Sequence, residues 1–81
     1  MTMPTLYFKT TCQYCRKVID FAEANGISLE MRDVVLEPAH MERVIEEGGK
    51  RQVPYLVDDK EGVAMYESDD IIEYLRTHYV N

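Results

Sequence analysis

The sequence predicts an α/β domain with a mixed four-stranded sheet and helices on both faces, in the order β-α-β-α-β-β-α. An apolar run, a helical pattern and a second apolar run open the chain, and such a βαβ unit makes its two strands parallel. Later, two short apolar runs flank a charged turn that ends in glycine, which predicts an antiparallel hairpin. At 81 residues the chain is long enough for one domain, and we expect residues 1–81 to form it.

The first half of the chain predicts the βαβ unit. Residues 5–9 are β-branched and aromatic and lie between Pro4 and two threonines, Thr10 and Thr11, which are candidates for a helix cap. Residues 13 to about 25 follow a helical period and stop at Asn25-Gly26. Residues 27 to about 35 alternate imperfectly between apolar and polar side chains, which predicts the second strand. The apolar side chains expected to face inward from the helix are Val18, Ile19 and Ala22.

The second half predicts a helix, a hairpin and a last helix. The second helix follows Pro38 and ends at Gly48-Gly49, and the hairpin pairs residues 54–57 with residues 63–66 through a turn at 58–62. Ser68 is the expected cap of the last helix, with two aspartates in the first turn that favour the helix dipole. The side chains expected to face inward are Met41, Val44 and Ile45 from the second helix, and Ile71, Ile72, Leu75 and Tyr79 from the last one.

Composition and charge exclude some classes of protein. The net charge of −6 argues against nucleic-acid binding, which needs a basic surface. The first four residues show no basic and apolar leader pattern, and no apolar run approaches the ~18 residues that cross a bilayer. We therefore expect a cytoplasmic monomer that binds neither nucleic acid nor membrane. Five basic residues flank the segments of the expected site and could bind a small anion there: Lys9, Arg16, Lys17, Lys50 and Arg51. Alternatively, Arg16 and Lys17 only cover an exposed face of the first helix.

The only two cysteines, Cys12 and Cys15, are three positions apart at the start of the first predicted helix. Unpaired amides and the helix dipole favour an anion there, so Cys12 is expected to be rich in thiolate. Cys15 lies one turn further in, within reach of a disulfide with Cys12. A disulfide closing so small a loop would stabilise the fold little. The pair is therefore predicted to be redox-active, with Cys12 as the nucleophile and Cys15 as the resolving cysteine.

The cysteine motif, the preceding lysine and the Val53-Pro54 pair together resemble a glutaredoxin of the thioredoxin superfamily over essentially the whole chain. The run from Tyr7 to Cys15 is similar to the pattern in which a lysine precedes a Cys-Pro-Tyr-Cys site by three residues. The resemblance implies a thioredoxin-like fold and a dithiol enzyme that reduces protein disulfides and glutathione mixed disulfides, with glutathione as co-substrate. Disulfide-containing and glutathionylated proteins are then its expected partners.

The same resemblance implies a glutathione site. Gln52-Val53-Pro54 resembles the family's Thr-Val-Pro, so the bond before Pro54 is expected to be cis and the backbone of Val53 to pair with glutathione. Glu67-Ser68-Asp69 matches the position that holds the γ-glutamyl end, where Ser68 is expected to add a hydroxyl group for the carboxylate and Asp69 to pair with the ammonium. The residues alone favour a plain helix cap at Ser68 and Asp69. Lys9 is expected to pair with the glycyl carboxylate or to lie near the Cys12 thiolate. Tyr14 is expected to form an aromatic wall or to be a surface residue.

Three departures from that pattern leave alternatives open. Gln13 replaces the usual proline and Gln52 the usual threonine, and Tyr66-Glu67 replaces the family's Gly-Gly. The segment from Tyr66 to Leu75 is closer to the N-terminal domain of glutathione transferases, which share this fold and bind glutathione. The alternative functions are a glutathione-ligated iron–sulfur cluster module held by Cys12 of two protomers, and a reductant fed by thioredoxin reductase. No zinc site is expected, because His40 and His78 are far from the cysteines in sequence.

Overall fold

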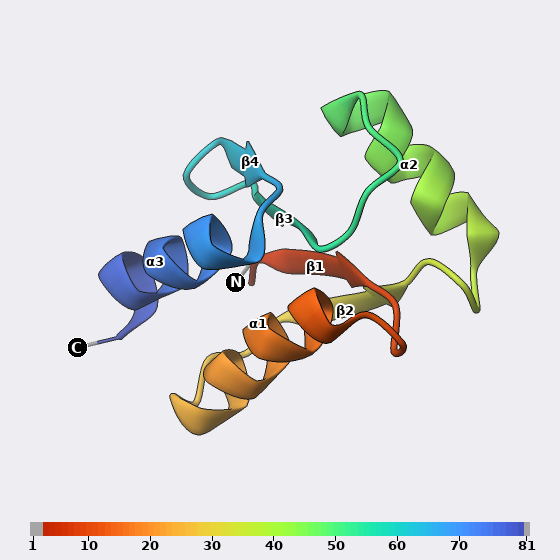
Figure 1. Ribbon diagram of the computed structural model, residues 1–81. Coiled ribbons are helices and arrows are strands. Elements are labelled where there is room, and N and C mark those ends of the chain that lie inside the picture. Colours follow the sequence, from red (N-terminus) through yellow and green to blue (C-terminus); the bar gives the residue numbers. More distant parts are fainter. Residues whose placement is uncertain (1–2, 81) are drawn as a thin grey trace.

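The structure is a computed structural model that describes residues 3–80. Met1 and Thr2, part of the stretch inspected for a leader, lie outside the described residues together with Asn81. The predicted order of elements is confirmed (Figure 1). The strands and helices are β1 (Thr5–Phe8), α1 (Gln13–Ala24), β2 (Glu30–Asp33), α2 (Pro38–Gly48), β3 (Tyr55–Asp58), β4 (Val63–Met65) and α3 (Ser68–Tyr79).

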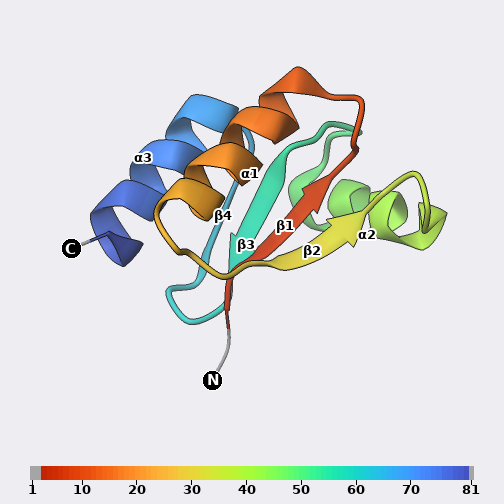
Figure 2. The same cartoon turned by 90° about the horizontal axis from the view of Figure 1, so that it is seen from below.

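The sheet has four strands in the order β2-β1-β3-β4 and is mixed, as predicted. Strand β1 pairs in parallel with β2 and antiparallel with β3, and β3 pairs antiparallel with β4. Helices α1 and α3 lie side by side on one face, and α2 covers the other (Figures 1 and 2). No helix within residues 3–80 is long and apolar enough to cross a membrane.

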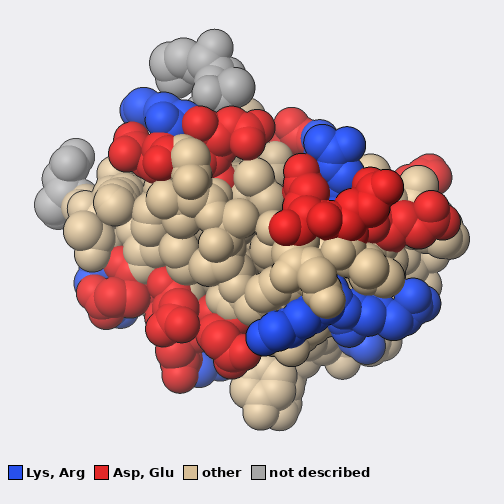
Figure 3. Space-filling view, turned by 90° about the horizontal axis from the view of Figure 1, so that it is seen from above, with Lys and Arg blue, Asp and Glu red and all other residues tan. Residues whose placement is uncertain are grey.

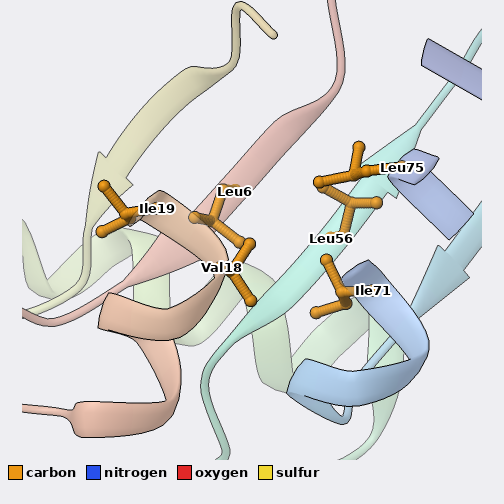
Figure 4. Close-up of a cluster of buried hydrophobic side chains, with 6 residues drawn as sticks. All are labelled: Leu6, Val18, Ile19, Leu56, Ile71 and Leu75. Atoms are coloured by element: carbon orange, nitrogen blue, oxygen red, sulfur yellow. The ribbon is translucent and has the colours of Figure 1, made fainter. Parts of the chain in front are cut away.

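The core has two parts because neighbouring residues of β1 and β3 point to opposite faces of the sheet. Leu6 and Leu56 face α1 and α3, where they join the cluster drawn in Figure 4. Tyr7 and Tyr55 face α2 and pack with Val44. Burial on both faces fixes the register of the central strands, since a slip of one residue would exchange the two sets. The first cluster consists of Leu6, Val18, Ile19, Leu56, Ile71 and Leu75.

Several predicted boundaries were wrong by a few residues. Strand β2 covers only Glu30–Asp33, because the preceding residues pack against the core from a loop instead of pairing. Tyr66, predicted to end the last strand, lies outside β4 and turns its hydroxyl group toward Val44 and Lys50. Asp58, predicted to begin the hairpin turn, is the last residue of β3 and is 1% exposed.

Candidate functional site

A groove of about 490 Å³ lies where the loop before β3 meets the N-terminal ends of α1 and α3. Its volume is within the ~300–1,000 Å³ common for small-molecule sites. Five of the predicted site residues line it, namely Tyr14, Val53, Pro54, Ser68 and Asp69, together with Gln52 and Glu67. The other three, Cys12, Cys15 and Lys9, are outside this lining set.

Cys12 is the N-cap of α1, two residues before the groove-lining Tyr14. This corrects the choice of Thr10 or Thr11 as the cap. The Sγ atom of Cys12 accepts a hydrogen bond from the backbone N–H of Cys15 at 3.4 Å. Burial opposes ionisation of Cys12, but hydrogen bonds from Cys15 and from the Tyr14 amide, with the charge of Lys9, outweigh it and lower its pKa. The helix start therefore favours a thiolate at Cys12, as expected.

Cys15 has the opposite environment. Its side chain is 0% exposed, and burial raises the pKa of its thiol to about 12, with a further contribution from the neighbouring Cys12. Both cysteines are free thiols in the structure. At neutral pH, Cys15 is therefore a neutral thiol that supports Cys12 through its amide.

The loop before β3 forms one wall of the groove. The peptide bond between Val53 and Pro54 is cis, so this prediction is confirmed. The ladder between β1 and β3 includes Tyr55 but not Val53, which leaves the Val53 backbone outside the sheet. Val53 and Pro54 both line the groove. An extended peptide can therefore add its backbone to Val53 in the manner of a short extra strand.

The start of α3 forms the opposite wall. Glu67 is its N-cap, not Ser68, and Ser68 is the first residue of the helix. Glu67 has φ 52° and is the only residue with positive φ, other than glycine, within residues 3–80. Such a conformation costs free energy at a side chain with a Cβ and is concentrated at binding and active sites. It places an exposed carboxylate directly before the buried Ser68, at the helix end that attracts anions.

Two cations near the groove have defined partners. Lys17 Nζ lies 2.8 Å from Asp69 Oδ1 and links α1 to α3, although both side chains are largely exposed. The predicted partner of a ligand ammonium, Asp69, is thus shared with Lys17. Lys9 does not line the groove; its charge acts on Cys12 and lowers the pKa of that thiol. Of the two roles expected for Lys9, the structure supports the one beside the thiolate.

Charge is unevenly distributed around the groove. Figure 3 shows several separate groups of acidic side chains on one face, with the largest group of basic side chains as a band at the lower right and smaller ones elsewhere. In sequence, Lys50 and Arg51 directly precede the groove-lining Gln52. The groove thus has an acidic wall at Glu67 and Asp69 and basic residues beside the opposite wall. In residues 3–80, no three His, Cys, Asp or Glu side chains are placed to hold a metal ion.

Gln52 and Glu67 are lining residues that were missing from the predicted site. Gln52 Nε2 donates a hydrogen bond to Glu67 Oε2 at 3.3 Å, so the two side chains meet between the walls. Both belong to runs that matched the predicted glutathione site, Gln52-Val53-Pro54 and Glu67-Ser68-Asp69, but neither was predicted to contact the ligand. The available signal was the segment from Tyr66 to Leu75, whose similarity to glutathione transferases pointed to Glu67.

Comparison with solved structures shows close similarity to glutathione transferases. A delta-class glutathione transferase of Nilaparvata lugens is 28% identical with a TM-score of 0.82, over 96% of this chain and 37% of that one. Human glutathione S-transferase T1-1 is 31% identical with a TM-score of 0.79, over 94% and 32%. A glutathione transferase homologue of Drosophila mojavensis with bound glutathione is 25% identical with a TM-score of 0.82, over 98% and 36%.

The chain therefore spans about a third of the length of these proteins. Among curated proteins, no match was found. The model of the family described as "Glutathione S-transferase, N-terminal domain" matches residues 6–81. The expected thioredoxin-like fold, with its mixed four-stranded sheet, is confirmed by this match and by the topology.

The family match corrects the main functional prediction. The similarity to glutathione transferases that was noticed in the last segment extends over residues 6–81. The assignment to the glutaredoxins was wrong, and so was the predicted function of a dithiol reductase for protein disulfides and glutathione mixed disulfides. The two alternative functions, an iron–sulfur cluster module and a reductant fed by thioredoxin reductase, depended on the same assignment and are withdrawn with it. The chain belongs to the glutathione S-transferase N-terminal domain family.

Proposed function

We propose that this chain forms the glutathione site of a glutathione transferase-like protein. The observation that carries the proposal is the single groove that joins the Val53 backbone, the Glu67 carboxylate and the start of α3 at Ser68. These groups match the three chemically different parts of a γ-glutamyl peptide. The Drosophila mojavensis relative, which has bound glutathione, supports this choice of ligand.

The γ-glutamyl end of glutathione carries a carboxylate and an ammonium group next to each other. The first amides of α3 and the Ser68 hydroxyl group are suited to the carboxylate, because a helix N-terminus offers unpaired N–H donors. The carboxylate of Glu67 is suited to the ammonium, with Asp69 beside it. This arrangement places the ammonium on the acidic wall and explains why an exposed carboxylate precedes a helix start that attracts anions.

The rest of the peptide runs toward the opposite wall. The backbone of the cysteinyl residue pairs with Val53, outside the β1–β3 ladder. The glycyl carboxylate lies toward Arg51 and Lys50, which precede Gln52 in the chain. Electrostatic attraction at both ends then fixes the direction of the peptide in the groove.

Cys12 is the side chain that we propose to face the sulfur atom of bound glutathione. It is the N-cap of α1, and its pKa is below the usual value of a thiol. Tyr14 lines the groove on the same helix and covers the space beside the ligand sulfur. Cys15 supports the Cys12 thiolate through its amide; its resolving role stays a prediction.

Isothermal titration calorimetry with reduced glutathione tests the proposal. Wild type is expected to bind glutathione, and Glu67→Gln to bind it about tenfold more weakly, since hydrogen bonds to charged groups contribute about 1.5–3 kcal/mol. Glu61→Gln is the matched control, because it removes an exposed carboxylate from the β3–β4 turn, outside the groove. No heat of binding with wild type, or equal affinities for Glu67→Gln and wild type, would contradict the assignment.

A further inference from the structure

Tyr66 makes an unusual set of contacts for a residue between a strand and a helix. Its hydroxyl oxygen accepts a hydrogen bond from the Lys50 backbone N–H at 3.1 Å. The same group lies 3.0 Å from the Lys50 carbonyl oxygen and 3.4 Å from that of Val44, both of which can accept its proton. The Lys50 Nζ atom lies over the Tyr66 ring, 5.3 Å from its centroid. One side chain therefore holds both the backbone and the ammonium group of Lys50.

Gly48 provides the space for this contact. A Cβ atom at Gly48 would overlap the Tyr66 hydroxyl oxygen and lie 2.6 Å from its Cζ atom. Gly48 is the last residue of α2, where alanine is otherwise the better helix former. Contact with Tyr66, and not a positive φ, therefore explains why this position is a glycine. On the other side, Tyr66 packs on Tyr55 with ring centroids 4.6 Å apart.

These contacts connect the two walls of the groove. Tyr66 directly precedes Glu67 and Ser68, which form the acidic wall. Lys50 lies two residues before Gln52, in the loop that forms the other wall. The hydrogen bond between Gln52 and Glu67 is a second link between the same two segments. Tyr66 therefore ties the segment that precedes the acidic wall to the loop that forms the other wall.

We infer that Tyr66 is a positioning residue that holds the Lys50–Arg51 segment at the distance at which the groove selects γ-glutamyl tripeptides with a free C-terminal glycyl carboxylate. The inference rests on the proposed function, since it concerns the same groove. Tyr66 acts through the backbone of Lys50 and does not touch the peptide. Loss of its hydroxyl group frees the basic end of the groove and leaves the γ-glutamyl end in place.

The test compares two ligands that differ only in the glycyl residue, glutathione and γ-glutamylcysteine, by calorimetry on wild type and Tyr66→Phe. Phenylalanine keeps the ring against Tyr55 and Lys50 and removes only the hydroxyl group. We expect glutathione affinity to fall about tenfold and γ-glutamylcysteine affinity to change less than about twofold, because about 1.4 kcal/mol corresponds to a factor of ten. Gly48→Ala is expected to reproduce this pattern by displacing the Tyr66 hydroxyl group.

Gly62→Ala is the matched control for a general loss of stability. Gly62 has φ 67° in the β3–β4 turn, and no atom lies within 4 Å of a Cβ placed there, so alanine strains the turn without touching the groove. It should leave the ratio of the two affinities at the wild-type value. Equal weakening of both ligands in Tyr66→Phe, or no weakening, overturns the positioning role and leaves the proposed function intact. Absence of glutathione binding in wild type overturns both.

Discussion

Polar groups at the two ends of strand β3 lie in opposite environments, buried and hydrogen-bonded at one end and exposed in a groove at the other. At its end, Asp58 is 1% exposed, and the hydroxyl groups of Tyr74 and Tyr79 each donate a hydrogen bond to Asp58 Oδ2 at 2.6 Å. Before its start, Val53 and the facing Glu67 line an open groove. The polar groups of the first arrangement are hydrogen-bonded within the chain, and the second is the groove proposed to bind glutathione.

This difference shows which polar groups serve folding and which are available for recognition. Within residues 3–80, no buried side-chain nitrogen or oxygen lacks a hydrogen-bond partner. The Asp58 cluster satisfies that requirement by joining the hairpin to the end of α3. The groove instead keeps the carboxylates of Glu67 and Asp69 exposed at the surface. Substitutions at the two ends should therefore separate stability from binding.

The largest expected effect is the loss of stability in Asp58→Asn. The buried carboxylate accepts both tyrosine hydroxyl groups, and hydrogen bonds to charged groups contribute about 1.5–3 kcal/mol each. We expect the free energy of unfolding, measured in urea, to fall by about 2–4 kcal/mol. Asp59→Asn, at an exposed position one residue later, should change it by less than about 0.5 kcal/mol. Similar values for the two variants would show that the cluster is not a source of stability.

The same cluster predicts how stability depends on pH. Burial opposes ionisation of Asp58, but hydrogen bonds from Tyr74, Tyr79 and the Lys60 amide outweigh it and hold the pKa below its usual value. A carboxyl group with a lowered folded pKa stabilises the protein above the unfolded value of about 3.9, and this stabilisation is lost as the pH falls through the folded pKa. The difference in unfolding free energy between wild type and Asp58→Asn should therefore start to shrink at about pH 5 and continue to shrink as the pH falls below about 3.9 and through the folded pKa. A constant difference would contradict the lowered pKa.

Near the groove, the two cysteines should differ in their reactivity toward an alkylating reagent. Iodoacetamide should label Cys12 in the folded protein below the pH of about 8.5 at which an ordinary thiol ionises. Cys15, which is buried and has a raised pKa, should be labelled only after unfolding. Peptide mass spectrometry distinguishes the two sites. Labelling of both cysteines at one rate in the native protein would remove the distinction between them.

The smallest expected effect comes from Lys9. Burial raises the pKa of Cys12, and the hydrogen bonds and the charge of Lys9 lower it; the charge of Lys9 is the weakest of these influences. Lys9→Met should therefore move the pH profile of Cys12 labelling upward only slightly, and added salt should reduce the difference from wild type. Arg43→Met removes a positive charge from α2, where Arg43 pairs with Glu47, and should leave the profile unchanged. An equal shift in both variants would point to net charge instead of the Lys9 position.

The fold was predictable because its signals are local. Apolar runs, the glycines that end helices and the charged turn placed all seven elements in their correct order. Five groove residues were predicted as well, since Tyr14, Val53-Pro54 and Ser68-Asp69 lie at the starts of elements, where sequence motifs are clearest. The cysteine motif was also placed correctly, at the start of α1.

The rest depended on contacts between distant residues. The hydrogen bond between Gln52 and Glu67 joins residues 15 positions apart in the sequence. The positive φ of Glu67 could not be predicted, because such a conformation is usually signalled by a glycine. Asp58 belongs to a charged run typical of turns, and only the two tyrosines of α3 explain its burial. The family was missed because the cysteine motif was given more weight than the segment from Tyr66 to Leu75, although that segment carries the transferase similarity.

The edges of the sheet have a consequence for the behaviour of the protein at high concentration. An edge strand exposes unpaired N–H and C=O groups that can template a strand of another molecule. On one edge, β2 presents Glu30 and Arg32, which form an ion pair with each other. On the other, β4 is only three residues long. The charged side chains of β2 and the short length of β4 both oppose the addition of strands from other molecules, which is the step that leads to fibrils.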